Sequence, residues 1–367
     1  MTPSPTFEEL FGRPPAVQAR APGHVNLMGE HTDYNGGFAL AMAIPQELAV
    51  ELAPAAAGEV RAFSVEMGGA PESFTLGREA RGRGWLDRVQ GVTATLARDG
   101  HTVSGFDLRI SSRVPAGAGL GSSAALVVAV LRALRQAFAL RLDDLALAQA
   151  AHRAESEFMG APGGILDPMA SSLADPSAAL LVDTRTLAHE RLPLPREVEP
   201  LVVASGSRSA SPVGGMRARR DECARAAALL GVGRLGDLGE RDLSRSSRLP
   251  EPLPRRVRHV VREDARVLDA ADALRRGDAD YLGALFDASH ASQRDDFEVS
   301  TPEIDVLVAL ARAQPEVLGA RLTGGGFGGS IVALARADTA AAVGRTVVER
   351  YARLSGLTPA LLVPAPA

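Results

Sequence analysis

The feature that most limits the possible folds is a glycine-rich loop that runs directly into an apolar helix pattern. The loop PAGAGLGSSAAL covers residues 115–126, and alanine, valine and leucine dominate the expected helix at 122–138. Small residues let the backbone approach a ligand closely, and a helix N-terminus offers unpaired N–H groups and a positive dipole end. This combination suits a phosphate group. Tight helix packing with a serine N-cap is the alternative, and the absence of Gly-Lys-Ser/Thr excludes a Walker loop.

A second glycine-rich loop, TGGGFGGS, covers residues 323–330 and leads into the strand pattern IVALA. Each glycine costs roughly 0.5–1 kcal/mol in a regular element, so five of them around one phenylalanine need a reason other than stability. A close backbone approach to a ligand, or to the first loop, would supply that reason. Two such loops far apart in one chain point to a nucleotide.

A third stretch, APGHVNLMGEHTDYNGG at residues 21–37, crowds polar side chains into a short segment that ends in glycines. Three explanations are open for it. His24, Glu30, His31 and Asp33 have side chains that can bind a metal ion. The same side chains could instead line a pocket for a polar small molecule, or form a solvated turn.

The composition and net charge of the chain exclude several classes of protein. A chain of 367 residues with 46% apolar residues can bury a large core in one or two domains. The net charge of −4 argues against nucleic acid or an anionic membrane as a partner. A single cysteine, Cys223, leaves no disulfide within the chain. We find neither a signal-peptide pattern nor an apolar run long enough for a bilayer, and we expect a cytoplasmic protein.

Hydrophobic periodicity predicts a mixture of helices and strands without strict alternation, which indicates α+β layers rather than a doubly wound parallel sheet. The stretch at 241–255 is polar and rich in proline, and we expect a loop there. The expected strands cover residues 38–44, 47–53, 106–113, 178–183, 201–207 and 331–335, and the expected helices cover 85–96, 122–138, 143–158, 213–230, 255–276 and 278–294.

Taken together, these motifs resemble the GHMP kinases. PAGAGLGSSAA matches that family's phosphate-loop pattern, RLTGGGFGGS matches its C-terminal glycine-rich motif, and VNLMGEHTDYNGG looks like the galactokinase signature. The resemblance implies a fold of two α+β domains with the active site in the cleft between them, and we place the domains at residues 1–180 and 181–367. It also implies an ATP-dependent sugar 1-kinase that uses Mg²⁺ and acts on galactose. We expect the protein to be a monomer. The crowded polar stretch then becomes a sugar pocket.

The resemblance also implies roles for individual residues. Asp167 would orient or deprotonate the anomeric hydroxyl, and Ser123 and Glu155 would hold Mg²⁺. The residues expected at the sugar are Glu30, His31, Asp33, Gly164 and Met216. The residues expected at the nucleotide are Trp85, Gly117, Gly119, Leu120, Gly121, Ser122, Ser123, Gly325 and Gly326.

Several positions depart from the galactokinase pattern. His24 stands where the family has an arginine that contacts the transferring phosphoryl group; a guanidinium keeps its charge at every physiological pH, whereas an imidazole loses it near neutrality. Met216 replaces a tyrosine that contacts the sugar, Asp87 and Arg88 replace Asn-Tyr, and GGILDP replaces CGIMDQ. These changes leave two alternatives open. One is a kinase of arabinose, an N-acetylhexosamine or a uronic acid, and the other is a sugar and ATP sensor with impaired catalysis.

Overall fold

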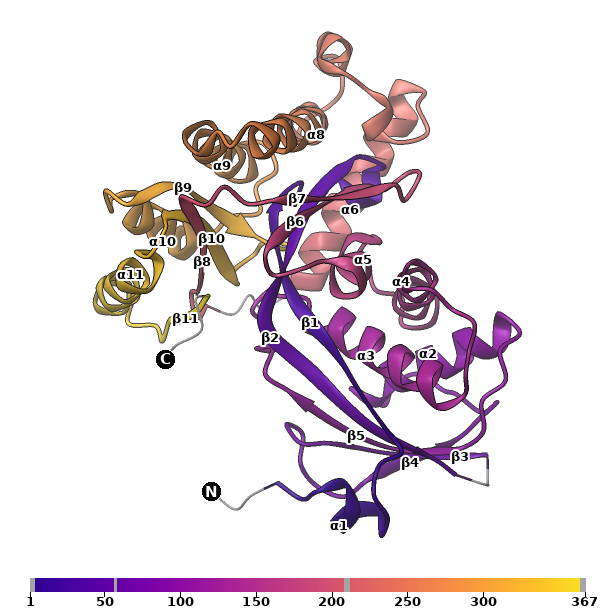
Figure 1. Ribbon diagram of the computed structural model, residues 1–367. Coiled ribbons are helices and arrows are strands. Elements are labelled where there is room, and N and C mark those ends of the chain that lie inside the picture. The colour runs from indigo at the N-terminus through magenta and orange to yellow at the C-terminus, as the bar shows by residue number, and fades with distance from the viewer. Residues whose placement is uncertain (1–3, 56–57, 208–211, 364–367) are drawn as a thin grey trace. The chain divides into compact units, whose positions relative to one another are not determined.

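The computed structural model describes residues 4–55, 58–207 and 212–363, and the chain divides into two compact units (Figure 1). The first unit takes residues 1–23, 46–115 and 121–173, and the second takes 24–45, 116–120 and 174–367. The sequence predicts one boundary near residue 180, whereas the structure interleaves the two units. The physical reason is that two long strands, β1 (Val17–Met28) and β2 (Phe38–Pro54), each begin in one unit and end in the other.

In the first unit, a sheet with the strand order β4-β3-β5-β2 carries helices on one face (Figure 1). The strands that complete it are β3 (Glu59–Ser64), β4 (Glu72–Thr75) and β5 (Phe106–Ser112), and β1 pairs with β2. The β3–β5 pair is parallel, while β2 pairs with β5 in an antiparallel register that sets Val50 opposite Ile110. The helices are α2 (Leu86–Arg98), α3 (Ser122–Ala137), α4 (Asp144–Arg153) and α5 (Leu166–Leu173).

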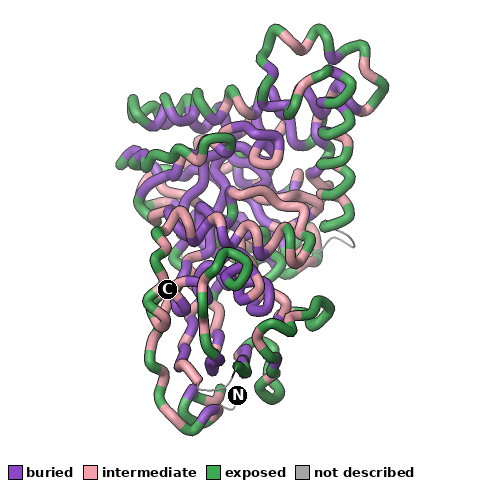
Figure 2. Tube along the Cα trace, turned by 90° about the vertical axis from the view of Figure 1, so that its right-hand side faces the viewer, coloured by how far each residue is buried: buried purple, intermediate pink, exposed green. Residues whose placement is uncertain are grey.

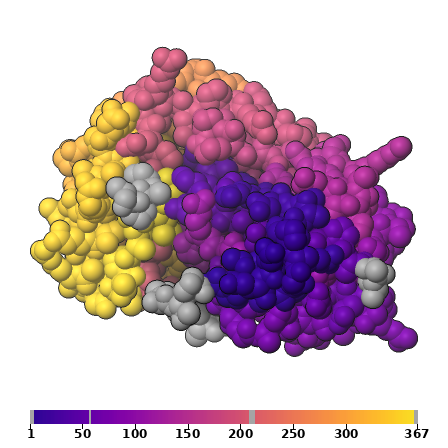
Figure 3. Space-filling model, turned by 60° about the horizontal axis from the view of Figure 1, so that its bottom comes forward, coloured from indigo at the N-terminus to yellow at the C-terminus, as the bar shows by residue number. Residues whose placement is uncertain are grey.

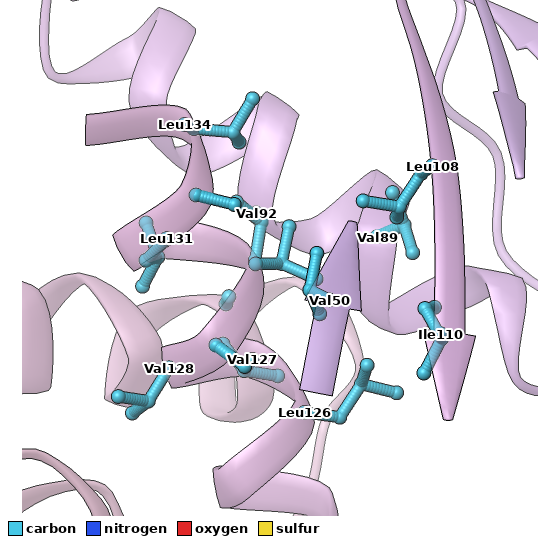
Figure 4. Close-up of a cluster of buried hydrophobic side chains, with 14 of the residues drawn as sticks. Val50, Val89, Val92, Leu108, Ile110, Leu126, Val127, Val128, Leu131 and Leu134 are labelled. Atoms are coloured by element: carbon cyan, nitrogen blue, oxygen red, sulfur yellow. The ribbon is translucent and has the colours of Figure 1, made fainter. Parts of the chain in front are cut away.

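The core of the first unit forms where α2 and α3 face the sheet. Figure 4 shows Val89 and Val92 of α2 and Leu126 of α3 pointing toward side chains of β2 and β5. These positions recur at helical spacing, as the apolar pattern predicts. A short helix, α1 (Phe7–Phe11), lies on the surface of this unit, within the indigo segment of Figure 3.

The second unit is built around an antiparallel sheet with the order β11-β8-β10-β9. Its strands are β8 (Val198–Ala204), β9 (Val317–Thr323), β10 (Ser330–Arg336) and β11 (Ala360–Val363), and its long helices are α6 (Pro212–Leu230), α8 (Leu253–Arg276), α9 (Ala279–Asp295), α10 (Pro302–Arg312) and α11 (Ala340–Ser355). In the same unit the first half of β2 pairs with β6 (Ala178–Asp183), which pairs with β7 (His189–Pro193). Buried and exposed residues alternate along the long helices (Figure 2). No helix among the described residues is long and apolar enough to cross a membrane.

Most of the expected elements are present, and the α+β prediction is confirmed. The helix expected at 143–158 begins with Asp143 as its N-cap and changes to a π-helix, η2 (Ala154–Phe158), after α4. The prediction of a loop at 241–255 is wrong in part. Short turns precede a helix, α7 (Leu243–Ser246), and α8 already begins at Leu253, because apolar residues of both segments pack into the core of this unit. The remaining short elements are η1 (Asp33–Asn35), η3 (Leu235–Asp237) and η4 (Glu240–Asp242).

Candidate active site

The polar stretch of the sequence forms a tight turn, residues 29–37, between β1 and β2 in the second unit. Gly29 has a φ of 94°, and a Cβ added there would lie 2.8 Å from the carbonyl oxygen of Phe38. The hydroxyl of Thr32 lies 2.6 Å from the carbonyl oxygens of both Gly29 and Phe38, which closes the turn. His31 has a φ of 66°, a conformation that costs a non-glycine residue about 1–3 kcal/mol and that clusters at functional sites. Hydrogen bonds and close backbone contacts therefore fix the conformation of this turn, which is not a solvated loop.

Glu30 is buried within this turn, with 2% of its surface exposed. Its carboxylate pairs with the guanidinium of Arg321 and accepts a hydrogen bond of 3.1 Å from the backbone N–H of Gly324. Burial raises the pKa of Glu30 to about 7, although Arg321 acts in the opposite direction. The protein's own donors therefore occupy both oxygens of the carboxylate that the sequence assigns to a sugar hydroxyl, and that assignment stays a prediction.

His31 follows Glu30 and is also buried. Its Nδ1 lies 2.9 Å from the hydroxyl of Tyr34, and its ring packs on Phe297 with 4.6 Å between centroids. Burial lowers the pKa of His31 to about 3, and His259 and Arg219 act in the same direction. The imidazole is thus neutral at physiological pH. Its Nε2 is buried and makes no hydrogen bond of regular geometry among the described residues, although the backbone of Gly325 interacts with the ring and acts to raise the pKa.

The other predicted residues of this stretch lie at its two ends. His24 is buried in β1, and its backbone N–H donates to the carbonyl oxygen of Leu120 at 3.1 Å. Asp33 is half-buried at the first position of η1. Within the described residues there is no cluster of three or more histidine, cysteine or acidic side chains that could hold a metal ion. The described residues therefore give no support to the first of the three explanations, a metal site in this stretch.

The two glycine-rich loops meet within the second unit. A Cβ added to Gly324 would lie 3.1 Å from the carbonyl oxygen of Gly119, and the hydroxyl of Ser330 donates to the carbonyl oxygen of Ala118 at 2.6 Å. Gly117, Gly119 and Gly324 all have φ between 74° and 81°, a region open to glycine but costly for other residues. The close approach between the loops explains why both stretches are rich in glycine.

A pocket of about 510 Å³ opens where the loops meet. It contains five of the residues that the sequence assigns to ligands, namely Gly117, Gly119, Met216, Gly325 and Gly326. Residues that sequence reasoning missed complete the lining: Ala116, Ser207, Thr323, Phe327, Gly328 and Gly329. Met216 packs so closely that a Cβ added to Gly325 would lie 2.5 Å from its sulfur. Backbone groups and one thioether therefore form much of the wall.

In the first unit, the predicted metal ligands lie side by side at the start of α3. The hydroxyl of Ser123 donates to Oε1 of Glu155 at 2.6 Å and accepts from Nε of Arg88 at 2.9 Å. The N-cap of α3 is Gly121, with a φ of 66°, and no side chain caps the helix. The serine N-cap that we weighed against a phosphate site is therefore absent, and the N–H groups of the first turn, including that of Ser122, have no side-chain cap.

The remaining predicted residues of the first unit lie in or just before the helices α5 and α2. Asp167 is exposed in the first turn of α5, and Gly164 is half-buried in the segment before that helix. Trp85 precedes α2 and packs against the core, and its indole N–H donates to Glu72 at 2.7 Å.

Family models match the chain in three places. They are the galactokinase galactose-binding signature at residues 5–54, the GHMP kinases N-terminal domain at 87–175 and the GHMP kinases C-terminal domain at 270–353. The chain belongs to the GHMP kinase family. Within that family it is similar to the galactokinase of Lactococcus lactis, solved in complex with galactose. The two are 31% identical over 97% of this chain and 95% of that chain, with a TM-score of 0.90.

Two other solved structures share the fold at lower identity. Methanococcus jannaschii mevalonate kinase is 18% identical over 96% of this chain and 98% of that chain, with a TM-score of 0.68. Streptococcus pneumoniae phosphomevalonate kinase, in complex with phosphomevalonate and AMPPNP, is 18% identical over 94% and 98% of the two chains, with a TM-score of 0.69. These likenesses show the fold alone.

Proposed function

We propose that this chain is an ATP-dependent kinase that transfers the γ-phosphate of ATP to the anomeric hydroxyl of galactose. The observation that carries the proposal is the pocket that the two glycine-rich loops form in a chain with the galactose-binding signature. The full-length likeness to a galactokinase solved with galactose supports the choice of sugar. A pocket of about 510 Å³ is large enough for small-molecule ligands.

The nucleotide phosphates would be bound by backbone N–H groups of the first loop, from Gly119 to Ser122. Positive φ values at Gly119 and Gly121, together with a helix N-terminus that lacks a side-chain cap, favour an anion there. Such fixed donors stabilise charge that develops on a transferring phosphoryl group. Gly325 and Gly326 would approach the nucleotide from the second loop, and Trp85 is our proposed contact on the adenine side.

Ser123 and Glu155 fit a magnesium ion. Mg²⁺ prefers hard oxygen ligands and commonly takes one or two from the protein and the rest from phosphates and water. A hydroxyl and a carboxylate 2.6 Å apart supply two such oxygens. The ion would neutralise charge on the phosphate oxygens. Arg88 shares the same hydroxyl, so one lone pair of Ser123 Oγ is already engaged by a cation.

The sugar would be oriented by hydroxyl contacts with His31, Asp33 and the backbone of Gly164. Asp167 would accept the proton of the anomeric hydroxyl as that oxygen attacks the γ-phosphate. Its exposure at the start of α5 supports access by a substrate. His24 is our proposed partner for the transferring group, in place of the family's arginine.

A kinase of a different sugar is the second candidate, and Met216 favours it. Its thioether lines the pocket where the family has a tyrosine, so one hydrogen-bonding hydroxyl is lost from the wall. A wall that lacks this hydroxyl discriminates less between hexoses and pentoses. A sensor with impaired catalysis ranks third, because Ser122, Ser123 and Asp167 are all intact.

The test is an assay of ADP release with Mg²⁺ over a panel of galactose, arabinose, N-acetylgalactosamine and galacturonic acid. We expect turnover with galactose, and we expect Asp167→Asn to reduce it at least 100-fold because the proton acceptor is lost. Asp269→Asn, an exposed change on α8, is the matched control and should leave the rate unchanged. Preference for another sugar would reassign the substrate. Thermal stabilisation by ATP and sugar without turnover would support the sensor.

A further inference from the structure

A buried charged network contacts the second glycine-rich loop at Gly324 and includes residues with no assigned role. Arg321 is on β9, two residues before the second glycine-rich loop, and is fully buried, as is Glu263 of α8. Neither side chain is part of the pocket wall. Buried charges are rare because removing them from water is costly, so a buried pair needs partners that satisfy every group.

The guanidinium of Arg321 meets that need with bonds in three directions. It pairs with the carboxylate of Glu30, and its Nη1 donates to the carbonyl oxygens of Asn26 at 3.3 Å and Leu27 at 2.9 Å. Its Nε donates to the hydroxyl of Ser289 on α9 at 3.1 Å. Arg321, on β9, thus connects that strand by hydrogen bonds to the end of β1 and to Glu30 of the polar turn.

Glu263 joins the same segments from the side of α8. Its carboxylate accepts from the backbone N–H of Gly29 at 3.0 Å, from the hydroxyl of Ser289 at 2.7 Å and from Nε of Arg266 at 2.8 Å. Nη2 of Arg321 lies 3.6 Å from the same carboxylate. Burial opposes ionisation of Glu263, but the cations Arg266 and Arg321 outweigh it and hold its pKa well below its usual range. The carboxylate therefore stays charged.

The network ends on the backbone of the second glycine-rich loop. Glu30 accepts the N–H of Gly324, and Gly324 is the residue that packs against Gly119 of the first loop. Glycine loops have no side chains to hold them, so a fixed backbone position must come from bonds to the main chain. The carboxylate of Glu30, held by Arg321, is such a bond.

We propose that Arg321 and Glu263 are positioning residues that, through Glu30, hold the second glycine-rich loop against the first and so set the shape of the pocket. The proposal rests on the proposed function only for the identity of the ligands. In this proposal Glu30 acts through its bond to the backbone of Gly324, whatever else it contacts. Arg321 and Glu263 are added as residues that act without contacting a ligand.

Variants that change the volume of the side chain little or not at all test this proposal. Glu263→Gln removes the charge that faces Gly29, Ser289 and Arg321, and Ser289→Ala is a milder change that removes only the hydroxyl between Arg321 and Glu263. The matched control is Asp107→Asn in the first unit. That carboxylate is also fully buried, and it pairs with Arg13 at 2.6 Å and Arg61 at 2.7 Å.

Calorimetry with AMPPNP and with galactose measures the effect without requiring turnover, at a temperature where circular dichroism shows each variant folded. We expect Glu263→Gln to weaken binding of both ligands about tenfold and Ser289→Ala about threefold. Asp107→Asn should lower the melting temperature but leave both affinities within twofold of the wild type. The kinetic readout is kcat/KM, which should fall in parallel with affinity for the two network variants.

The outcomes separate the two proposals. Unchanged affinities in both network variants, alongside a lowered melting temperature, would overturn the positioning role and leave a purely structural network. Equal losses of affinity in Asp107→Asn would overturn it too, because any buried ion pair would then act alike. If the wild type binds AMPPNP and galactose but turns over no sugar, the proposed kinase fails while the positioning role is still measured by calorimetry.

Discussion

A buried histidine behind the polar turn should make this protein sensitive to acid. His259 of α8 is fully buried, with its Nε2 3.2 Å from the carbonyl oxygen of Glu30 and its Nδ1 2.9 Å from the hydroxyl of Ser292. A carbonyl can only accept, so Nε2 carries the hydrogen. The Ser292 hydroxyl also lies 3.2 Å from the carboxylate of Asp296, so its single hydrogen serves either that carboxylate or Nδ1. The ring also packs on Phe297 with 4.4 Å between centroids. This environment fits the neutral imidazole.

The charged groups around His259 set the size of the effect. Burial lowers its pKa to about 4 from an ordinary value of 6.5; Glu263 opposes this shift, and Arg266 and Arg321 reinforce it. Between these two values the unfolded chain binds a proton that the folded protein does not. Stability is therefore lost as the pH falls from about 6.5 toward 4. Acidification from pH 7 to pH 5 should remove about 2 kcal/mol of unfolding free energy through this one residue.

Urea denaturation of the wild type and of His259→Gln at pH 7 and pH 5 measures this contribution. Glutamine keeps a donor for the carbonyl of Glu30 but does not titrate, so the difference between the two proteins isolates the histidine. Between pH 7 and pH 5, we expect the unfolding free energy of the wild type to fall by about 2 kcal/mol more than that of the variant. His189→Gln, a change of an exposed histidine on β7, should follow the wild type. Parallel losses in the wild type and His259→Gln would refute the reasoning.

Three further predictions concern the pocket and its neighbours. Gly325→Ala should destabilise the protein by about 1–3 kcal/mol, because the added methyl group crowds Met216. In thermal denaturation, the double variant with Met216→Ala should recover most of that loss. Additive losses in the double variant would contradict the contact. Arg88→Ala should lower the Mg²⁺ concentration needed for half-maximal activity, because it frees a lone pair of the Ser123 hydroxyl and removes a nearby cation. An unchanged or higher Mg²⁺ requirement would count against Ser123 as a metal ligand. His24→Arg should raise turnover at pH 8.5 by restoring a permanent positive charge, and an unchanged pH–rate profile would exclude that role.

The sequence by itself determined the parts of this protein that depend on local signals. Apolar spacing located α2 and α3, because helical periodicity involves only residues close together in the chain. The glycine-rich loops were visible because glycine is the residue that tolerates positive φ and close backbone contact. The order of these motifs along the chain was sufficient to indicate the family.

The tertiary structure alone decided which residues meet. Glu30 and Arg321 are separated by 291 positions, and Gly29 and Glu263 by 234, so no periodicity or spacing in the sequence relates them. An arginine two residues before TGGGFGGS in an apolar strand was the only local sign of the network. The division into interleaved units and the bonds of Glu30 to Arg321 and Gly324 also depend on long-range packing. The physical reason is that a buried charge takes its properties from whichever donors the fold brings to it.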